Sequence, residues 1–528
     1  MTIPAPSPHR GRRRAVATEL GGIGAALSVA LLVLAHLADS PRASLLFTDG
    51  DSMQLALVAS SLRIGQPQEW AFSAVLFLPE LAVYLPVAAV VGDPRAALAV
   101  AGTLNWLACY AAYRAVAGGL RMGREHAVLA ATVATAVLGA MALAESSADR
   151  NALEPASLLM TTTYYSATVV ATLGAVACAL RMLDVGRLHR RRQVVGASAV
   201  LCALVAVAVL SNPIALAWTV IPLAATTVLA LLARLPRHRA VLIAAVLASG
   251  AAMGLLGRIP FATWITEDGG GKIRPDRAAA SAMYYLGLAQ QRLVTAPGAL
   301  ELVLVVLLLV TGGVLLPRAI RSRRPGEVVL AGMAVLAPLA VLAGAVLLGT
   351  AAARYLQPGA FLPPLAVLGA LAVAVRLPRP PRVRVPPRRA VAAGVVVLAL
   401  GLGTVGTASG VVAGRAVARP DPDLACVTRW VDASGQYGAG QFWTVRAPKA
   451  LVADPRRLIQ TDAALNGYAW LVNRADFNRR RVSFLVSSPD SPPFALPRSA
   501  SDPGGVVRCG RYTITEYPAG LTLGSAHS

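Results

Sequence analysis

The stretch Thr18–Asp51, TELGGIGAALSVALLVLAHLADSPRASLLFTDGD, joins an apolar run to a pair of carboxylates. Residues 18–39 are long and apolar enough to cross the hydrocarbon core of a bilayer as one helix. Asp49 and Asp51 follow shortly afterwards, with a single glycine between them. The stretch therefore predicts a membrane span that brings an acidic pair to the membrane edge.

The composition of the whole chain repeats this apolar pattern. Of its 528 residues, 56% are hydrophobic and only 14% are charged, whereas about 25% are charged in a typical soluble domain. The mean hydropathy is +0.60. Repeated apolar runs of roughly 20 residues indicate a polytopic membrane protein. Nearly all the basic residues are arginine, which is typical of a GC-rich bacterial genome.

We predict eleven membrane spans and exclude the short apolar segment 74–92 from them. That segment contains Pro79, Glu80 and Pro86, which suits an interfacial or re-entrant helix. Counting it as a span would place the arginine-rich stretch after residue 180 on the outside. The predicted spans are 18–39, 95–117, 126–144, 159–180, 194–211, 214–232, 240–257, 299–316, 327–350, 359–375 and 390–411.

The distribution of arginine predicts the orientation. The formal net charge is +23, but the arginines lie in short loops on one side, as the positive-inside rule requires, so no nucleic-acid partner is expected. Residues 1–17 are then a cytoplasmic basic N-terminus. Residues 18–411 form an all-α polytopic membrane domain with external loops at 40–94 and 258–297, and 412–528 form a small extracytoplasmic α+β domain.

The cysteines and strand patterns of the tail suit an exported domain. Cys426 and Cys509 are its only cysteines, and a pair that brackets a small exported domain is typical of a disulfide; two unpaired thiols are the alternative. Residues 480–488 and 510–517 alternate like strands, and 461–477 has helical spacing.

The acidic pair has two compatible interpretations. Asp49 and Asp51 can bind a divalent cation, Mg or Mn, or one can act as a general base while the other orients it. In the structural interpretation, Asp51 caps a surface helix at 52–64, Gln54 completes a capping box, and Asp49 is a turn residue.

Basic residues on the outer side are rare, and two of them are candidate ligand-binding residues. Arg354 lies at the outer membrane edge, where it can contact a lipid phosphate or simply extend to the headgroups. Lys272 lies in the glycine-rich stretch EDGGGKIRPDR, which is either a lid over an anionic substrate or a disordered loop.

Three segments resemble the GT-C class of polytopic glycosyltransferases, which includes protein O-mannosyltransferases and aminoarabinose transferases. They are TDGDS at 48–52, the run that starts FLPELAVYLP at 77–86 and continues to 120, and RYLQPGAFLPPLAV at 354–367. The run at 77–120 departs from the class pattern, because the region that often has a lysine or a second acid reads FLPEL, with Glu80 and no lysine; Glu80 either helps the base or faces the headgroups.

The resemblance implies an enzyme that moves a sugar from a polyprenyl-phosphate-linked donor to an envelope glycan, lipid or protein acceptor. Asp49 or Asp51 would be the catalytic base or metal-binding acid, and Arg354 would contact the donor phosphate, with Tyr355 and Glu80 beside the substrate. The alternatives are a multi-pass transporter and a non-enzymatic envelope assembly protein. A transporter would keep charged residues and its polar site in mid-membrane.

Overall fold

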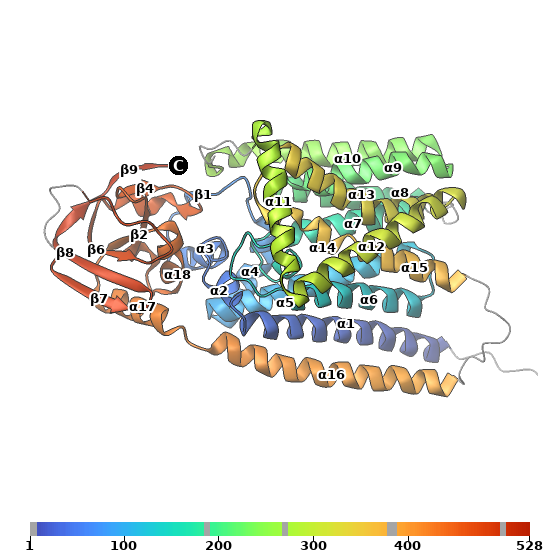
Figure 1. Cartoon of the computed structure of the whole chain (residues 1–528), viewed down its shortest axis with the longest axis horizontal. Coiled ribbons are helices and arrows are strands. Elements are labelled where there is room, and N and C mark those ends of the chain that lie inside the picture. Colours follow the sequence, from blue (N-terminus) through green and yellow to red (C-terminus); the bar gives the residue numbers. More distant parts are fainter. Residues whose placement is uncertain (1–7, 184–190, 267–272, 377–387, 497–502) are drawn as a thin grey trace, which may run out of the picture.

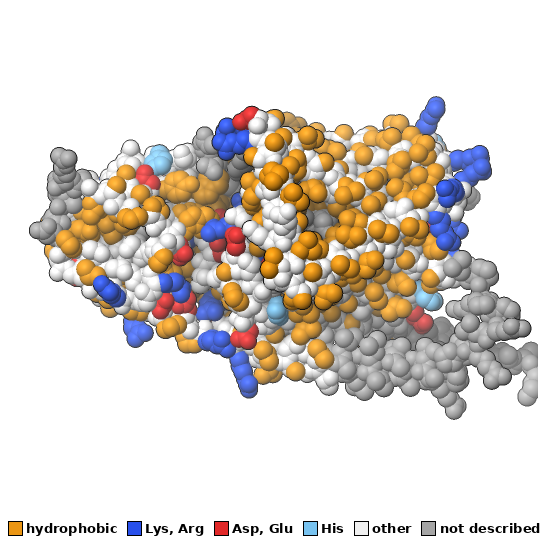
Figure 2. Space-filling model, viewed as in Figure 1, with side chains coloured by type: hydrophobic (Ala, Val, Ile, Leu, Met, Phe, Trp, Pro, Cys, Tyr) orange, Lys and Arg blue, Asp and Glu red, His pale blue; other side chains and the backbone are white. Residues whose placement is uncertain are grey.

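The computed structural model describes residues 8–183, 191–266, 273–376, 388–496 and 503–528. Figure 1 shows a bundle of long helices with a smaller sheet domain at one end. Figure 2 shows that apolar side chains cover the helical part and that arginines gather at its far end from the sheet domain. This surface is the one expected of a protein embedded in a bilayer.

Ten helical segments of the described residues are long and apolar enough to span a membrane. They show a multi-pass membrane protein. The predicted eleventh span, 390–411, falls in α16, which packs along α1. The structure describes the backbone of α16 throughout, but its side chains only from residue 403 onward. The long helices are α1 (Pro8–Ala38), α5 (Pro94–Gly119), α6 (Arg124–Leu143), α7 (Ser166–Leu183), α8 (Arg191–Ser211), α10 (Arg237–Gly257), α12 (Ala296–Arg321), α13 (Pro325–Leu347) and α16 (Arg388–Ala418).

The other two spans are not uniform α-helices. The first combines a π-helix, η3 (Leu216–Val220), with α9 (Ile221–Leu229) and η4 (Ala230–Ala233). The second combines η7 (Ala353–Leu356), α14 (Pro358–Phe361) and α15 (Leu365–Arg376). Pro358, Pro363 and Pro364 remove backbone donors in the second span, so that its chain turns where it meets the loops.

Short helices fill the end of the bundle that faces the sheet domain. The segment excluded from the spans forms α4, whose 14 residues are too few to cross a bilayer. The short helices are α2 (Ala43–Phe47), α3 (Gln54–Arg63), α4 (Leu78–Val91), α11 (Ala278–Leu293), η1 (Ser157–Leu159), η5 (Ile259–Trp264) and η6 (Pro275–Arg277).

The predicted surface helix is not on the surface. Helix α3 is buried over most of its length because the sheet domain covers the side that the sequence pattern assigned to headgroups and water. Its N-cap is Met53, with no side-chain cap, so the predicted capping role of Asp51 is wrong. Asp51 instead precedes a further turn of chain and faces the cavity described below.

The C-terminal region forms the predicted α+β domain. Its seven-stranded sheet has the order β7-β8-β6-β2-β3-β4-β9, with β2 parallel to both β3 and β6. Its elements are α17 (Pro422–Ser434), β2 (Gly438–Gln441), α18 (Phe442–Leu451), η8 (Pro455–Arg457), β3 (Leu458–Thr461), β4 (Asn466–Tyr468), η9 (Arg474–Asn478), β6 (Arg481–Ser487), β7 (Gly505–Cys509), β8 (Tyr512–Thr522) and β9 (Gly524–His527).

In this domain the disulfide and two strands agree with the sequence predictions, and one predicted helix does not. Cys426 of α17 and Cys509 of β7 form a disulfide with a Cα–Cα distance of 5.5 Å. The strands expected at 480–488 and 510–517 are β6 and β8, whereas the helix expected at 461–477 is wrong. That segment turns repeatedly: Leu465 and Leu471 have positive φ, and a Cβ on Gly467 would lie 2.9 Å from Phe477.

The sheet domain docks on the segment at 40–94 through backbone and side-chain bonds. Strand β1 (Trp70–Ala71) pairs antiparallel with β5 (Val472–Asn473). Next to this pair, the Arg474 guanidinium donates to the carbonyl oxygens of Trp70 and Thr263. Hydrogen bonds of this kind hold two surfaces in one register, because another register would leave these groups without their partners.

A buried charge network fixes the loop between α6 and α7. The Glu154 carboxylate pairs with Arg42 at 3.0 Å and with Arg292 at 2.7 Å, and Arg292 also pairs with Glu301. All four side chains are buried. The network holds three distant segments together and positions the loop that contains Arg150.

Candidate active site

The acidic pair lies in a turn between α2 and α3 that is held by its own side chains. The Asp49 carboxylate accepts the backbone N–H of Asp51 at 3.0 Å and the Tyr164 hydroxyl at 3.3 Å. The Ser52 hydroxyl donates back to the Leu45 carbonyl at 2.5 Å. Asp49 therefore fixes the backbone position of Asp51, while the side chain of Asp51 faces the cavity described below.

Each carboxylate faces one guanidinium. Arg150 Nη1 lies 3.4 Å from Asp49 Oδ2, and Arg354 Nη1 lies 3.5 Å from Asp51 Oδ2. Arg354 comes from η7, where the chain leaves α13, and its guanidinium lies about 6 Å from the ring centres of both Tyr164 and Tyr355. The aromatic rings and the ion pair together restrict the rotamers of Arg354.

A cavity of about 1450 Å³ opens next to these residues. Its polar end is formed by the acidic turn and the loops that face it. The sheet domain forms a second wall, which is mostly aromatic. The polar end includes Asp51, Arg150, Thr163, Tyr164, Asn212, Arg354 and Tyr355, and the aromatic wall includes Phe442, Trp443, Tyr468 and Trp470.

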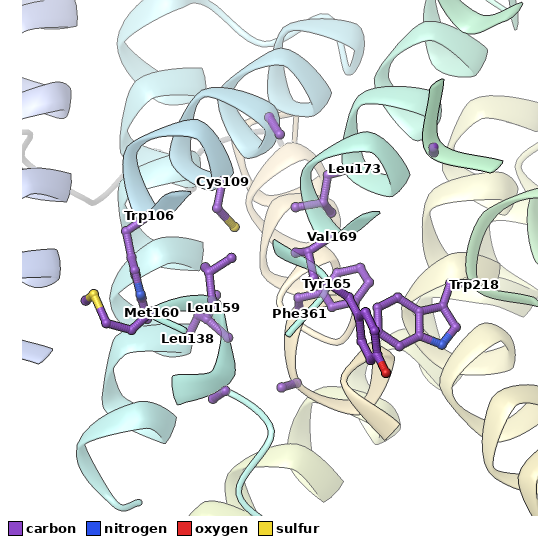
Figure 3. Packing of buried hydrophobic residues seen from close by; sticks show 14 of the residues in the cluster. Trp106, Cys109, Leu138, Leu159, Met160, Tyr165, Val169, Leu173, Trp218 and Phe361 are labelled. Carbon is purple, nitrogen blue, oxygen red and sulfur yellow. The ribbon is translucent and has the colours of Figure 1, made fainter. Parts of the chain in front are cut away.

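The other end of the cavity is an apolar groove between α9 and α13. Ile221 and Leu348 on its borders are 64% and 43% exposed, so the groove opens sideways where lipid surrounds the bundle. Its lining comprises Ile221, Pro222, Ala225, Thr226, Leu229, Leu336, Ala337, Ala340, Val341, Gly344, Ala345 and Leu348. The floor between groove and polar end is aromatic: Tyr165 meets Trp218 edge-on at 5.7 Å, as Figure 3 shows.

Several donors point at the polar end without a protein acceptor. Arg354 Nε, Thr163 Oγ1 and Asn212 Nδ2 are buried and have no hydrogen-bond partner within the described part of the chain. Unpaired buried donors of this kind are costly unless a ligand satisfies them. The arrangement suits a ligand with several anionic oxygens at one end and an apolar tail at the other.

The structure brings together four of the residues singled out in the sequence. Asp49, Asp51, Arg354 and Tyr355 meet at the acidic turn. Glu80 does not line the cavity: it is buried at the start of α4, where its carboxylate accepts the N–H of Ala167 at 3.3 Å. Lys272 lies outside the described residues.

Sequence reasoning missed Arg150, although a signal for it was present. Arg150 follows the third predicted span, so the predicted orientation places it in an outer loop, where the positive-inside rule disfavours arginine, as it does for Arg354. The same argument that selected Arg354 selects Arg150. The aromatic wall and Arg446, which is described below, had no such signal because the sheet domain has no recognisable motif.

The residues at the acidic turn do not by themselves form a complete site for the divalent cation that the sequence pattern suggested. Among the described residues, no group of three or more His, Cys, Asp or Glu side chains is arranged to hold a metal. Asp49 and Asp51 are already paired with arginines, so a cation there would have to displace two guanidinium groups. Mg²⁺ is often bound by one or two carboxylates together with substrate phosphates, so Asp49 and Asp51 would need further oxygen ligands from outside the turn.

No family model and no curated protein matches the chain. Among solved structures, ArnT from Cupriavidus metallidurans bound to undecaprenyl phosphate has a TM-score of 0.55 at 13% identity, covering 94% of this chain and 98% of that one. ArnT from Cupriavidus metallidurans in the apo state has a TM-score of 0.50 at 14% identity, covering 92% of this chain and 96% of that one. The archaeal oligosaccharyltransferase AglB from Archaeoglobus fulgidus, in complex with an inhibitory peptide and a dolichol-phosphate, gives 0.40 at 12% identity, over 88% and 69%.

The similarity to ArnT extends over nearly the full length of both chains, membrane helices and sheet domain included. The predicted fold class is therefore confirmed: the chain has a GT-C fold, an all-α polytopic membrane domain followed by a small α+β domain. More particularly, the fold is similar to that of ArnT.

Proposed function

We propose that the protein is a membrane glycosyltransferase that moves a sugar from a polyprenyl-phosphate-linked donor to an envelope acceptor. The observation that supports this most strongly is the shape of the cavity. One continuous space joins an apolar groove that opens to lipid with a polar end that is lined by the Asp51 carboxylate and by two guanidinium groups. A donor with a long apolar chain, a phosphate and a sugar has the same order of parts.

The polar end supplies the groups that the transfer requires. An acceptor hydroxyl attacks the anomeric carbon, the bond from that carbon to the phosphate oxygen breaks, and the hydroxyl proton passes to Asp51. The polyprenyl phosphate leaves with the electron pair of the broken bond. Arg354 then stabilises the negative charge that develops on the leaving phosphate. Asp49 does not line the cavity, so we assign it the role of holding Asp51 in place.

The ArnT structure was determined with undecaprenyl phosphate bound, and we place the corresponding lipid of this protein in the groove between α9 and α13. The test is binding of undecaprenyl phosphate to the purified protein. A large side chain at Ala340 fills the groove, so Ala340→Trp is expected to weaken binding at least tenfold. Leu342→Trp is the control, because Leu342 lies on α13 outside the groove. Equal binding by both variants would contradict this placement.

Activity is expected to depend on the ionisation of Asp49. Burial, followed by the charge of Asp51, raises the pKa of Asp49 to about 6. The ionised form faces Arg150, so protonation below this pH removes the ion pair beside the acidic turn. We expect kcat/KM to fall as the pH drops below about 6, and the step to disappear in Asp49→Asn. A profile that is level from pH 5 to 8 in the unchanged protein would contradict the prediction.

We further propose that the cavity faces the outside of the cell, with a cytoplasmic N-terminus and an extracytoplasmic sheet domain. The arginines at the far end of the bundle support this orientation (Figure 2). Alkaline phosphatase, which is active only outside the cytoplasm, is expected to be inactive when fused after residue 190 and active when fused after residue 420. The reverse result at either position would overturn the orientation.

A further inference from the structure

Helix α18 of the sheet domain lies against the acidic turn, although nearly 400 residues separate them in the sequence. Three of its residues make the contact: Phe442, Trp443 and Arg446. In Figure 1, α18 is beside α3, the helix that follows the turn. The sheet domain is therefore not only attached to the membrane domain near the site but touches the turn itself.

The first contact explains the glycine between the two aspartates. A Cβ on Gly50 would lie 2.8 Å from Phe442 Cε1 and 2.9 Å from Trp443 Cε3. These carbons belong to rings that are packed edge-on against each other at 4.5 Å, so they cannot easily move aside. Gly50 lets the turn approach α18 more closely than any other residue would allow.

The second contact is a buried arginine that holds the backbone of the turn. Arg446 is fully buried, and its Nε donates to the Gly50 carbonyl at 2.6 Å. Its Nη2 donates to Gln54 Oε1 at 2.7 Å, and its Nη1 donates to the Leu471 carbonyl. The guanidinium thus connects the turn, the start of α3 and the sheet domain.

The charge of Arg446 is also notable, because no carboxylate of the described residues forms an ion pair with it. Burial lowers the pKa of Arg446 to about 10, while the charges of Asp51 and Asp49 act to raise it. A buried cation without a contacting partner is costly to fold. Arg446 compensates for this cost through its hydrogen bonds and through the field of the two nearby aspartates.

The third contact restrains Arg150. The Arg150 guanidinium lies 3.4 Å above the ring of Trp443, and the same group pairs with Asp49 at 3.4 Å. Trp443 and Asp49 therefore confine the cation from two sides. A cation–π contact of this geometry orients a guanidinium as well as stabilising it.

We propose that Arg446 and Trp443 are positioning residues for sugar transfer: Arg446 fixes the backbone of the Asp49–Asp51 turn, and Trp443 fixes Arg150 against Asp49. The sheet domain is then a structural part of the active site. This inference rests on the proposed glycosyltransferase function, but it concerns rate rather than donor binding, because the groove and Arg354 lie in the membrane domain.

The test compares two arginines at the same domain interface. Arg446→Met removes the bonds to the turn, whereas Arg474→Met removes bonds to Trp70 and Thr263 that lie away from it. The assay combines a lipid extract of a strain that lacks the gene, in which unused donor accumulates, with envelope fragments of the same strain as acceptor, and it measures the release of polyprenyl phosphate. We expect Arg446→Met to lower kcat about 100-fold with KM for the extract within threefold. Arg474→Met should keep kcat within threefold.

Two further variants keep the proposal testable if Arg446→Met does not fold. Arg446→Lys keeps the charge and one donor, and is expected to keep at least tenfold more activity than Arg446→Met. Trp443→Leu, at a partly exposed position, is expected to lower kcat about tenfold without changing undecaprenyl phosphate binding. Unchanged kcat in Trp443→Leu, or equal losses in Arg446→Met and Arg474→Met, would overturn the proposal. Full activity in the Asp49→Asn, Asp51→Asn double variant would instead overturn the proposed function itself.

Discussion

Replacing Asp51 by Asn is expected to abolish measurable transfer, with kcat reduced about 1000-fold. General-base catalysis contributes roughly 10²–10⁴-fold in rate, and Asp51 is the carboxylate that reaches the cavity. Asn has nearly the same shape and keeps the backbone N–H that donates to Asp49. The amount of protein in the membrane and its binding of undecaprenyl phosphate should therefore stay unchanged. The measurement is the release of polyprenyl phosphate from the accumulated donor lipid.

Asp49→Asn is the internal comparison for this result. Its amide oxygen can still accept the Asp51 N–H, but the ion pair with Arg150 is lost. We expect a smaller loss, about 100-fold, because Asp49 acts through the position of Asp51 rather than on the acceptor. If Asp49→Asn were inactive and Asp51→Asn fully active, the roles of the two carboxylates would have to be exchanged.

Replacing Arg354 by Met is the second change with a large expected effect. Arg354 pairs with Asp51, and its Nε is buried without a partner next to the cavity. In the proposed mechanism, the variant loses both the contact with the donor phosphate and the charge that stabilises the leaving group. We expect kcat to fall 10²–10³-fold, the range seen when one stabilising donor is removed from an active site, and the donor KM to rise about tenfold.

The control for Arg354 is Arg258→Met. Arg258 donates to the carbonyl oxygens of Leu210 and Ala74, so it is a half-buried arginine near the cavity that contacts neither carboxylate. The Arg258→Met variant should be less stable than the unchanged protein, but its kcat should stay within threefold. An Arg354→Met variant with an unchanged donor KM and an unchanged rate would remove Arg354 from the mechanism.

The fold and the centre of the site could be predicted because both depend on local patterns. Apolar runs of fixed length, separated by arginine-rich loops, define the spans one at a time. The acidic pair is a contiguous motif, and Arg354 is exceptional in its own loop. The error at Asp51 has a physical reason: a polar residue before a short helix is a good cap in isolation, but here the helix begins later and the carboxylate faces a cavity.

The rest of the site could not be predicted because it depends on contacts between distant segments. Arg446 donates a hydrogen bond to Gly50, 396 positions away in the sequence. Neither residue lies in a sequence pattern that would predict this contact. The amphipathic pattern of α3 indicated a membrane surface, since a pattern cannot tell whether lipid or a protein domain covers a helix. Glu80 was chosen from its place in a motif, yet its carboxylate binds the first turn of α7 instead of the cavity.

The most direct test of the proposed function is the glycan composition of the cell envelope, measured by mass spectrometry. A strain that lacks the gene would be rescued with the unchanged protein or with the Asp49→Asn, Asp51→Asn double variant, at equal amounts in the membrane. We expect one sugar to disappear from the envelope, its lipid-linked donor to accumulate, and only the unchanged protein to restore it. Full restoration by the double variant would contradict the catalytic role of the acidic turn.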